Sequence, residues 1–144
     1  MLNVAFDLKN QIIADLEYSS NLEKISYENI LIMGMGGSGV AGDVMKILSN
    51  EISDKNIFVQ KDYSIPKQVK KFKPLCLFIS YSGNTEETLS GISDAKINNF
   101  DWIVISSGGK LIDMANKEGK EYIKIPSGLQ PRAAFGYLTL AISR

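Results

Sequence analysis

Short apolar runs alternate along the chain with longer segments in which apolar residues recur every three or four positions. The short runs lack the polar alternation of a half-exposed strand, so they predict strands covered on both faces. The longer segments predict amphipathic helices. The predicted strands are 30–33, 57–59, 75–79, 102–105 and 122–125. The predicted helices are 5–18, 38–48, 84–97, 110–116 and 131–142.

This alternation favours a parallel sheet between two helical layers. Right-handed crossovers then give a doubly wound topology. We therefore predict an α/β fold, a three-layer α-β-α sandwich with a five-stranded parallel sheet. The flavodoxin-like strand order 2-1-3-4-5 is a hypothesis that the pattern does not itself establish. The length of 144 residues fits one domain, so we predict a single domain over 1–144. In the helix 38–48 the apolar stripe is expected to face inward, and it consists of Val40, Val44, Ile47 and Leu48.

Composition narrows the classes of function. Sixteen basic residues balance sixteen acidic ones, which gives no electrostatic argument for binding nucleic acid or an anionic membrane. No apolar stretch reaches the roughly 20 residues of a membrane span, and the first residues lack the pattern of a signal peptide. The only cysteine, Cys76, lies in an apolar strand, so we expect a buried, non-nucleophilic thiol and a cytoplasmic location.

The sequence contains no histidine, the commonest general acid or base and the commonest transition-metal ligand. We expect no metal and no redox cofactor.

The first predicted strand runs into the glycine-rich loop 34–39. Glycine lets a backbone approach a ligand closely, and the helix that follows directs free N–H groups at the same point. Gly36, Gly37 and Ser38 are therefore candidate anion-binding residues. A tight strand-to-helix turn without a ligand is the alternative.

The same loop spells G-x-G-x-x-G, the dinucleotide fingerprint. A dinucleotide site usually has an acidic residue about 20 positions further on, at the end of the second strand. Glu51 and Asp54 precede that strand, and Asp62 follows Lys61. A Rossmann-type nucleotide-binding domain therefore stays open as an alternative, with Asp62 as its acidic residue.

The third predicted strand ends at a second unusual loop, which offers hydroxyl groups and another helix N-terminus. Ser80, Ser82 and Thr85 are candidate ligands of a tetrahedral phosphate, because such a group presents several acceptors at once. Thr85 could instead serve only as an N-cap, with Glu86 and Glu87 at the positive end of the helix. Two such loops at one sheet edge favour a phosphate carried by a small molecule.

A third feature is the segment 126–132, which places Arg132 in the first turn of the last predicted helix. A cation there opposes the helix dipole by roughly 0.3–1 kcal/mol. An anion or a reacting oxygen facing Arg132 would compensate for that cost, and an ordinary surface arginine is the alternative.

Three segments together resemble the sugar isomerase (SIS) domain, and more closely the N-terminal half of the bifunctional phosphoglucose/phosphomannose isomerases. The segments are GMGGSGVAGD at 34–43, SYSGNTEETL at 80–89 and QPRAAFGY at 130–137. The resemblance implies that Ser38, Ser80, Ser82 and Thr85 hold a substrate phosphate, with backbone donors from Gly36 and Gly37. It also implies that Arg132 lies near the reacting carbons.

The resemblance further implies interconversion of glucose 6-phosphate or mannose 6-phosphate with fructose 6-phosphate through a cis-enediol(ate). Family enzymes have two SIS domains and form homodimers, and their catalytic glutamate lies in the second half. We therefore expect a second SIS domain to be missing from this chain, a homodimer as the assembly, and a chain that is inactive alone. A non-catalytic sugar-phosphate-binding regulatory module is a further alternative.

Overall fold

The computed structural model describes residues 7–19 and 26–143, and it contains one six-stranded, mostly parallel sheet. The strand order is β1-β6-β5-β4-β2-β3, with β1 antiparallel to β6 and the other neighbours parallel. The strands are β1 Glu17–Tyr18, β2 Asn29–Gly34, β3 Asn56–Gln60, β4 Leu75–Ile79, β5 Trp102–Ser106 and β6 Tyr122–Lys124. All five predicted strands are present in the predicted order, but the predicted count of five is wrong because β1 adds a sixth strand at the edge.

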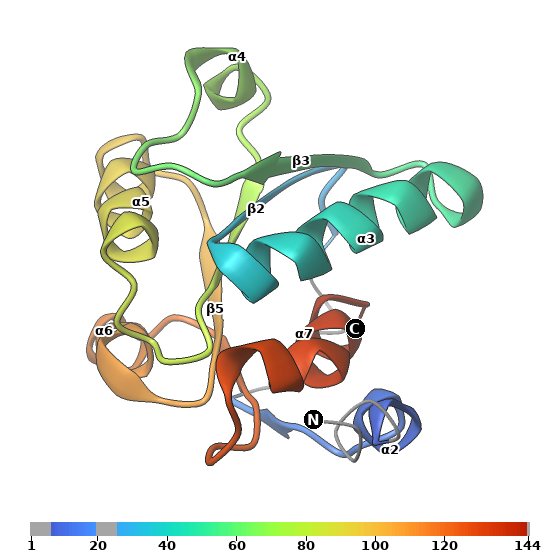
Figure 1. The fold of residues 1–144 in the computed structure, drawn as a ribbon. Coiled ribbons are helices and arrows are strands. Elements are labelled where there is room, and N and C mark those ends of the chain that lie inside the picture. The colour runs from blue at the N-terminus through green and yellow to red at the C-terminus, as the bar shows by residue number, and fades with distance from the viewer. Residues whose placement is uncertain (1–6, 20–25, 144) are drawn as a thin grey trace.

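Helices cover both faces of this sheet (Figure 1). They are α2 Leu8–Ile12, α3 Gly36–Ile52, α4 Lys67–Lys70, α5 Glu86–Ile97, α6 Gly109–Glu118, the 3₁₀ turn η2 Pro131–Ala134, and α7 Phe135–Ser143. The predicted last helix is thus divided into a 3₁₀ turn and an α-helix. Helices α4, α5 and α6 lie on one face, whereas α3 and α7 lie on the other with α2 against α7 (Figure 1).

Each face has its own apolar core, as the continuous apolar strands predict. Successive residues of β4 alternate between the two: Cys76 and Phe78 face α5 and α6, whereas Leu77 and Ile79 face α3 and α7. All five residues of β4 are buried. The central strands are therefore rigid supports for whatever follows them.

The N-terminal segment differs from the predicted helix 5–18. Residues 5 and 6 lie outside the described residues, and the helix seen is only α2, followed by β1. Strand β1 pairs with the free edge of β6, and Glu17 forms an ion pair with Lys124 at 3.2 Å. Edge pairing satisfies backbone groups that β6 would otherwise leave open, so the chain leaves the helix to make it.

Helix α3 packs on the sheet through the face opposite to the predicted one. Its buried residues are small, whereas Val40 is 48% exposed and Ile47 66% exposed. A β-carbon added at Gly42 would lie 2.9 Å from Cγ2 of Ile32, so only small side chains allow this close approach. The apolar stripe of α3 consequently faces outward. Among the described residues, no helix is long and apolar enough to cross a lipid bilayer.

Candidate phosphate site at the carboxyl ends of β2 and β4

The two predicted anion-binding loops meet at one point. Gly34 ends β2 and is the register partner of Ile79, which ends β4. A β-carbon added at Gly34 would lie 2.9 Å from the carbonyl oxygen of Ile79 and 3.0 Å from Cβ of Ser38. Ser38, in the first turn of α3, is 6% exposed.

Three hydroxyl groups converge in the second loop, and we call Ser80, Ser82 and Thr85 the hydroxyl cluster. Oγ of Ser80 lies 2.7 Å from Oγ1 of Thr85 and 3.4 Å from Oγ of Ser82. The backbone N–H of Gly83 also donates to Oγ of Ser80 at 3.1 Å. The cluster thus brings donors that can rotate toward an acceptor together with a backbone N–H group.

Thr85 occupies the N-cap position of α5 but forms no side-chain cap hydrogen bond. Its hydroxyl turns to Ser80 instead. The alternative in which Thr85 serves only as an N-cap is therefore wrong. The N–H groups in the first turn of α5 lack a side-chain acceptor from Thr85, and such groups, together with the helix dipole, favour an anion at a helix N-terminus.

The loop after β5 contacts the backbone of the loop that carries the hydroxyl cluster. Gly83 has φ of +69°, and a β-carbon there would lie 1.8 Å from the carbonyl oxygen of Gly108. Oγ of Ser107 donates to the carbonyl oxygen of Tyr81 at 2.6 Å. The N–H of Leu111 donates to the carbonyl oxygen of Gly83 at 3.0 Å. The conformation of the second loop therefore depends on glycine at position 83 and on contacts with the loop after β5.

Arg132 stands in η2, beside the first loop. A β-carbon added at Gly37 would lie 3.7 Å from the carbonyl oxygen of Pro131 and 3.8 Å from Cα of Arg132. The Arg132 side chain is exposed, and its Nε and Nη2 donate to Oε1 of Gln130 at 3.1 and 2.8 Å. The structure thus brings the Arg132 backbone to the glycine loop, while the guanidinium itself bonds to Gln130.

Two residues outside the predicted set hold this arrangement together. The hydroxyl of Tyr81 donates to the carbonyl oxygen of Pro126 at 3.2 Å and accepts from the N–H of Leu129 at 2.8 Å. Gln11 of α2 is 1% exposed and bonds to the backbone on both sides of the junction between η2 and α7. Tyr81 could have been found from its place between Ser80 and Ser82, but Gln11 carries no signal in the sequence.

Oγ1 of Thr88 is the one buried side-chain polar atom without a hydrogen-bond partner in the described part of the chain. Thr88 lies in the first turn of α5, one turn before Gly91, whose added β-carbon would touch Met33 and Phe78. Its helical face thus turns toward β2 and β4. An unpaired buried hydroxyl destabilises the fold, because it loses its hydrogen bonds to water.

Cys76 is fully buried in β4, as predicted. Burial raises the pKa of its thiol to about 12, with smaller contributions from the charges of Asp94 and Asp101. The thiolate, which is the reactive form, is therefore essentially absent at neutral pH. This result confirms that Cys76 is a strand residue and excludes it from the chemistry of the site.

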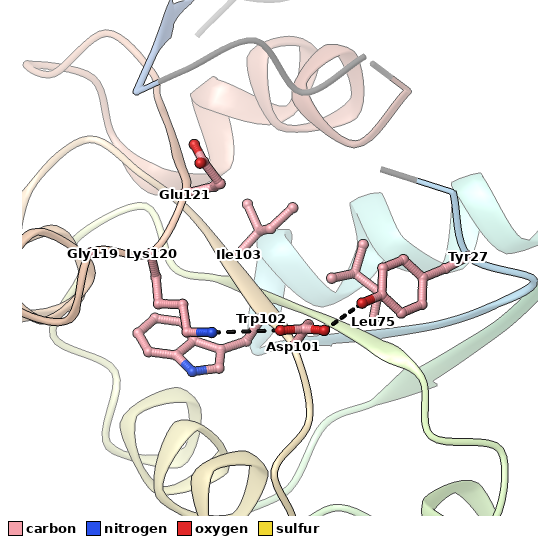
Figure 2. A pocket seen from close by; sticks show the side chains of 8 residues that line it. All are labelled: Tyr27, Leu75, Asp101, Trp102, Ile103, Gly119, Lys120 and Glu121. Carbon is pink, nitrogen blue, oxygen red and sulfur yellow. Dashed lines mark hydrogen bonds and ion pairs between the residues drawn. The ribbon is translucent and has the colours of Figure 1, made fainter. Parts of the chain in front are cut away.

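A cavity of about 270 Å³ lies at the amino ends of the strands, beside the first residues of β4 and β5 (Figure 2). Its polar groups are already paired: Asp101 accepts from the hydroxyl of Tyr27 and lies 3.5 Å from Nζ of Lys120. Lys120 in turn lies 5.9 Å from the centre of the Trp102 ring. The hydrogen bond to Asp101, burial and the charge of Asp101 raise the pKa of Tyr27 to about 12. Tyr27, Asp101 and Lys120 therefore stabilise the fold by bonding to one another.

A second hollow, of about 280 Å³, lies at the carboxyl end of β6, on the same sheet edge as the candidate site. Asp15, Ser107 and Ser127 line it together with Lys124, which is paired with Glu17. Because Ser107 also bonds to the backbone of Tyr81, this hollow adjoins the loop that carries the hydroxyl cluster.

A profile described as the SIS domain matches residues 25–117. The chain belongs to the SIS domain family. The match includes the glycine loop and the hydroxyl cluster, which confirms the resemblance inferred from the sequence motifs.

Curated relatives carry the names of sugar-phosphate enzymes. A bifunctional phosphoglucose/phosphomannose isomerase of Thermoplasma acidophilum is 44% identical over 94% of this chain and 40% of its own length. One from Caldicellulosiruptor bescii is 43% identical over 83% of this chain and 35% of its own length. A D-glucosamine-6-phosphate 4-epimerase of Sulfolobus acidocaldarius is 34% identical over 90% of this chain and 39% of its own length. The chain therefore spans less than half the length of these relatives.

Solved structures share the fold at lower identity. A hypothetical protein from Thermus thermophilus superposes with a TM-score of 0.64 at 23% identity, covering 81% of this chain and 33% of that one. The NanR protein of Vibrio vulnificus, solved in complex with ManNAc-6P, gives a TM-score of 0.61 at 15% identity, covering 99% of this chain and 51% of that one. At these identities the likeness establishes the fold alone.

Proposed function

We propose that residues 1–144 form a single phosphosugar-binding SIS domain, in which the hydroxyl cluster holds the phosphate of a hexose 6-phosphate. The observation that carries the proposal is the convergence of Ser82 and Thr85 on Ser80, with hydroxyl oxygens 3.4 and 2.7 Å from Oγ of Ser80 at the start of α5. Ser38 and the backbone of Gly36 and Gly37 complete the site from the first loop. Hydroxyl and N–H donors at two helix N-termini are the groups that stabilise a phosphate.

The parent protein is proposed to be an aldose–ketose isomerase acting on glucose 6-phosphate or mannose 6-phosphate to give fructose 6-phosphate. Support comes from the SIS family membership and from relatives named for the two activities. The relative named as a 4-epimerase acts, by its name, on another hexose 6-phosphate. Because these relatives are named for different reactions, the comparison favours phosphate binding, and not one particular reaction, as the property that they share.

In this mechanism the sugar ring opens, and a carboxylate moves a proton between C2 and C1. Arg132 stabilises the oxyanion of the cis-enediolate, because a guanidinium can donate two parallel hydrogen bonds to it. Two of the five N–H donors of Arg132 bond to Gln130, which leaves donors for a ligand. The mechanism needs no metal and no redox cofactor.

The base is proposed to come from outside this chain. Among residues 7–19 and 26–143, no carboxylate forms a hydrogen bond to the hydroxyl cluster. Glu86 and Glu87 lie in the first turn of α5, where their charges favour the positive end of the helix. We therefore expect the isolated chain to bind sugar phosphates weakly and to turn over little or none.

A second SIS domain and a partner subunit would complete the site, and we propose a homodimer as the assembly. Leu138 of α7 is fully buried, and Tyr137 and Ile142 pack against the core. The exposed apolar side chains of α2 and α3 provide an alternative contact surface. Sedimentation of the purified chain tests this part, and a strict monomer at high concentration would contradict it.

Titration of the ¹⁵N-labelled chain tests the phosphate site. Fructose 6-phosphate should shift the amides of 36–38 and 80–88, whereas fructose at the same concentration should not. The Ser82→Ala variant should weaken the binding, and Ser93→Ala on the exposed face of α5 is its control. Robust isomerase activity of the isolated chain would contradict an external base. Shifts elsewhere would contradict the site.

A non-catalytic binding module is the second candidate, and it is favoured because no carboxylate of residues 7–19 and 26–143 accepts a hydrogen bond from the hydroxyl cluster. The two candidates differ in the complete protein, where only the isomerase converts glucose 6-phosphate. The Rossmann-type alternative loses support because Lys61, which pairs with Asp43 of α3, directly follows β3. Asp62 also accepts a hydrogen bond from the N–H of Tyr63 at 2.7 Å. Binding of NAD without binding of fructose 6-phosphate would restore that alternative.

A further inference from the structure

The segment 130–136, which we call the arginine segment, carries Arg132 and lies at a junction of two kinds of helix. Residues Pro131–Ala134 form a 3₁₀ turn, and α7 begins at Phe135. The hydrogen-bond pattern changes at such a junction, so backbone groups there lose their partners within the helix. The position of Arg132 depends on how those groups are satisfied.

Gln11 satisfies two of them. Its Nε2 donates to the carbonyl oxygen of Ala133 at 2.9 Å, and its Oε1 accepts from the N–H of Gly136 at 3.0 Å. The side chain is 1% exposed, and it reaches Ala133 from α2 across 122 positions of the chain. The amide side chain of Gln11 thus forms hydrogen bonds with a carbonyl oxygen of the 3₁₀ turn and with an N–H group in the first turn of α7.

The fit at this contact is close. A β-carbon added at Gly136 would lie 2.6 Å from Cβ of Gln11 and 2.9 Å from Cδ1 of Leu8. Helix α2 is therefore seated directly on the start of α7, where glycine leaves the room for it. The first residues of the arginine segment, Pro131 and Arg132, lie beside Gly37 in the candidate phosphate site.

We propose that Gln11 is a positioning residue: it holds the arginine segment so that Arg132 faces a sugar phosphate bound at the hydroxyl cluster. The inference rests on the proposed function, and it adds a residue that touches neither the hydroxyl cluster nor the ligand. Gln11 acts through the backbone of Ala133 and Gly136. Its removal should therefore alter what Arg132 contributes and leave phosphate binding by the hydroxyl cluster unchanged.

The test uses Gln11→Met, which keeps the length of the side chain and removes both hydrogen bonds. The amide of Gly136 should exchange with deuterium about tenfold faster or more, because its acceptor is gone. Affinity for fructose 6-phosphate should fall by about tenfold, and affinity for inorganic phosphate should stay within about twofold. Asn10→Met, at an exposed neighbouring position, is the matched control.

A double-mutant cycle with Arg132→Met separates positioning from general loss of structure. If Gln11 acts through Arg132, Gln11→Met should cause no further loss of fructose 6-phosphate affinity in the Arg132→Met background. A full additional loss there, or an equal loss of inorganic phosphate affinity, would overturn the proposal.

Gln11→Glu keeps the test decisive if the methionine variant does not fold. A protonated carboxylic acid can make the same two hydrogen bonds, whereas a carboxylate cannot donate to Ala133. Burial raises the pKa of a carboxyl group, so the variant should match the wild type near pH 5 and lose affinity as the pH rises to 8. Each affinity is divided by that of the wild type at the same pH, which cancels the titration of the phosphate. A ratio that does not change with pH would overturn the proposal.

The outcomes for the wild type separate the two proposals. A wild-type chain that does not bind fructose 6-phosphate overturns the proposed function and this role of Gln11 together. A wild-type chain that binds, with Gln11→Met binding equally well, overturns the role of Gln11 alone.

Discussion

In the proposed site, the hydroxyl cluster and the arginine segment are the two sides, and different kinds of contact hold them. The hydrogen bonds of the hydroxyl cluster join residues at most five positions apart. The arginine segment is held by Gln11, whose two partners lie 122 and 125 positions away, and it approaches Gly37 of the first loop. Under the proposed function, the local part selects the chemical group that binds, and the long-range part sets the position of the Arg132 backbone.

Tyr81 is the connection between them. Its backbone belongs to the loop of the hydroxyl cluster, while its hydroxyl bonds to Pro126 and Leu129, just before the arginine segment. A change confined to one side should therefore leave the other intact, unless it acts through Tyr81. The following four substitutions test this division.

The largest effect is expected from Gly83→Ala, which disturbs the loop of the hydroxyl cluster. Its positive φ and the 1.8 Å approach to the carbonyl oxygen of Gly108 leave no room for a β-carbon. We expect a loss of about 4 kcal/mol in the free energy of unfolding, from backbone strain and overpacking together. Urea denaturation measures it. Gly119→Ala, with φ of +61° and open space around it, is the control and should cost only about 1 kcal/mol. Equal losses would show that crowding by Gly108 is unimportant.

Tyr81→Phe should remove the connection between the two sides and lower the free energy of unfolding by about 2 kcal/mol. The loss arises because the N–H of Leu129 is left without its acceptor. Hydrogen exchange should rise at the amides of 127–130 and stay unchanged at Gly83, whose N–H donates to Ser80. Tyr63→Phe, at an exposed ring, is the control. Faster exchange at Gly83 as well would mean that the two sides are not separable.

Ser80→Ala should weaken binding of inorganic phosphate by about tenfold, or about 1.4 kcal/mol, through loss of one donor and of the order it gives Thr85. Exchange of the Gly136 amide should not change. Calorimetry with phosphate and with fructose 6-phosphate measures the effect, and both ligands should lose affinity alike. Unchanged phosphate binding would remove Ser80 from the site.

The smallest effect, of opposite sign, is expected from Thr88→Val. The substitution removes the unpaired buried hydroxyl and should stabilise the fold by about 1 kcal/mol. Thr139→Val is the control, because its hydroxyl donates to the carbonyl oxygen of Phe135 and its loss should destabilise. A destabilised Thr88→Val chain would indicate a partner for this hydroxyl, and weaker phosphate binding would extend the site to Thr88.

The candidate site divides in the same way when sequence and structure are compared. Ser80, Ser82 and Thr85 could be predicted because their contacts lie within one loop, and the nearness of that loop to the glycine loop follows from the pairing of β2 with β4. The position of the Arg132 backbone beside Gly37 and the part played by Gln11 could not be predicted. Both depend on contacts between segments that are distant in the sequence.

The sequence by itself determined the five parallel strands and the two loops that follow β2 and β4, because buried apolar runs and glycine-rich turns are local signals. The order of the strands in the sheet was a hypothesis, because it depends on which strands pair in the tertiary structure. Only the tertiary structure decided that α3 packs through its glycines and alanine, with Val40 and Ile47 outward. Periodicity marks an apolar stripe, but it does not say whether the opposite, smaller face allows a closer approach to the sheet. The same holds for β1 and Gln11, whose roles come from backbone groups that other segments leave unpaired.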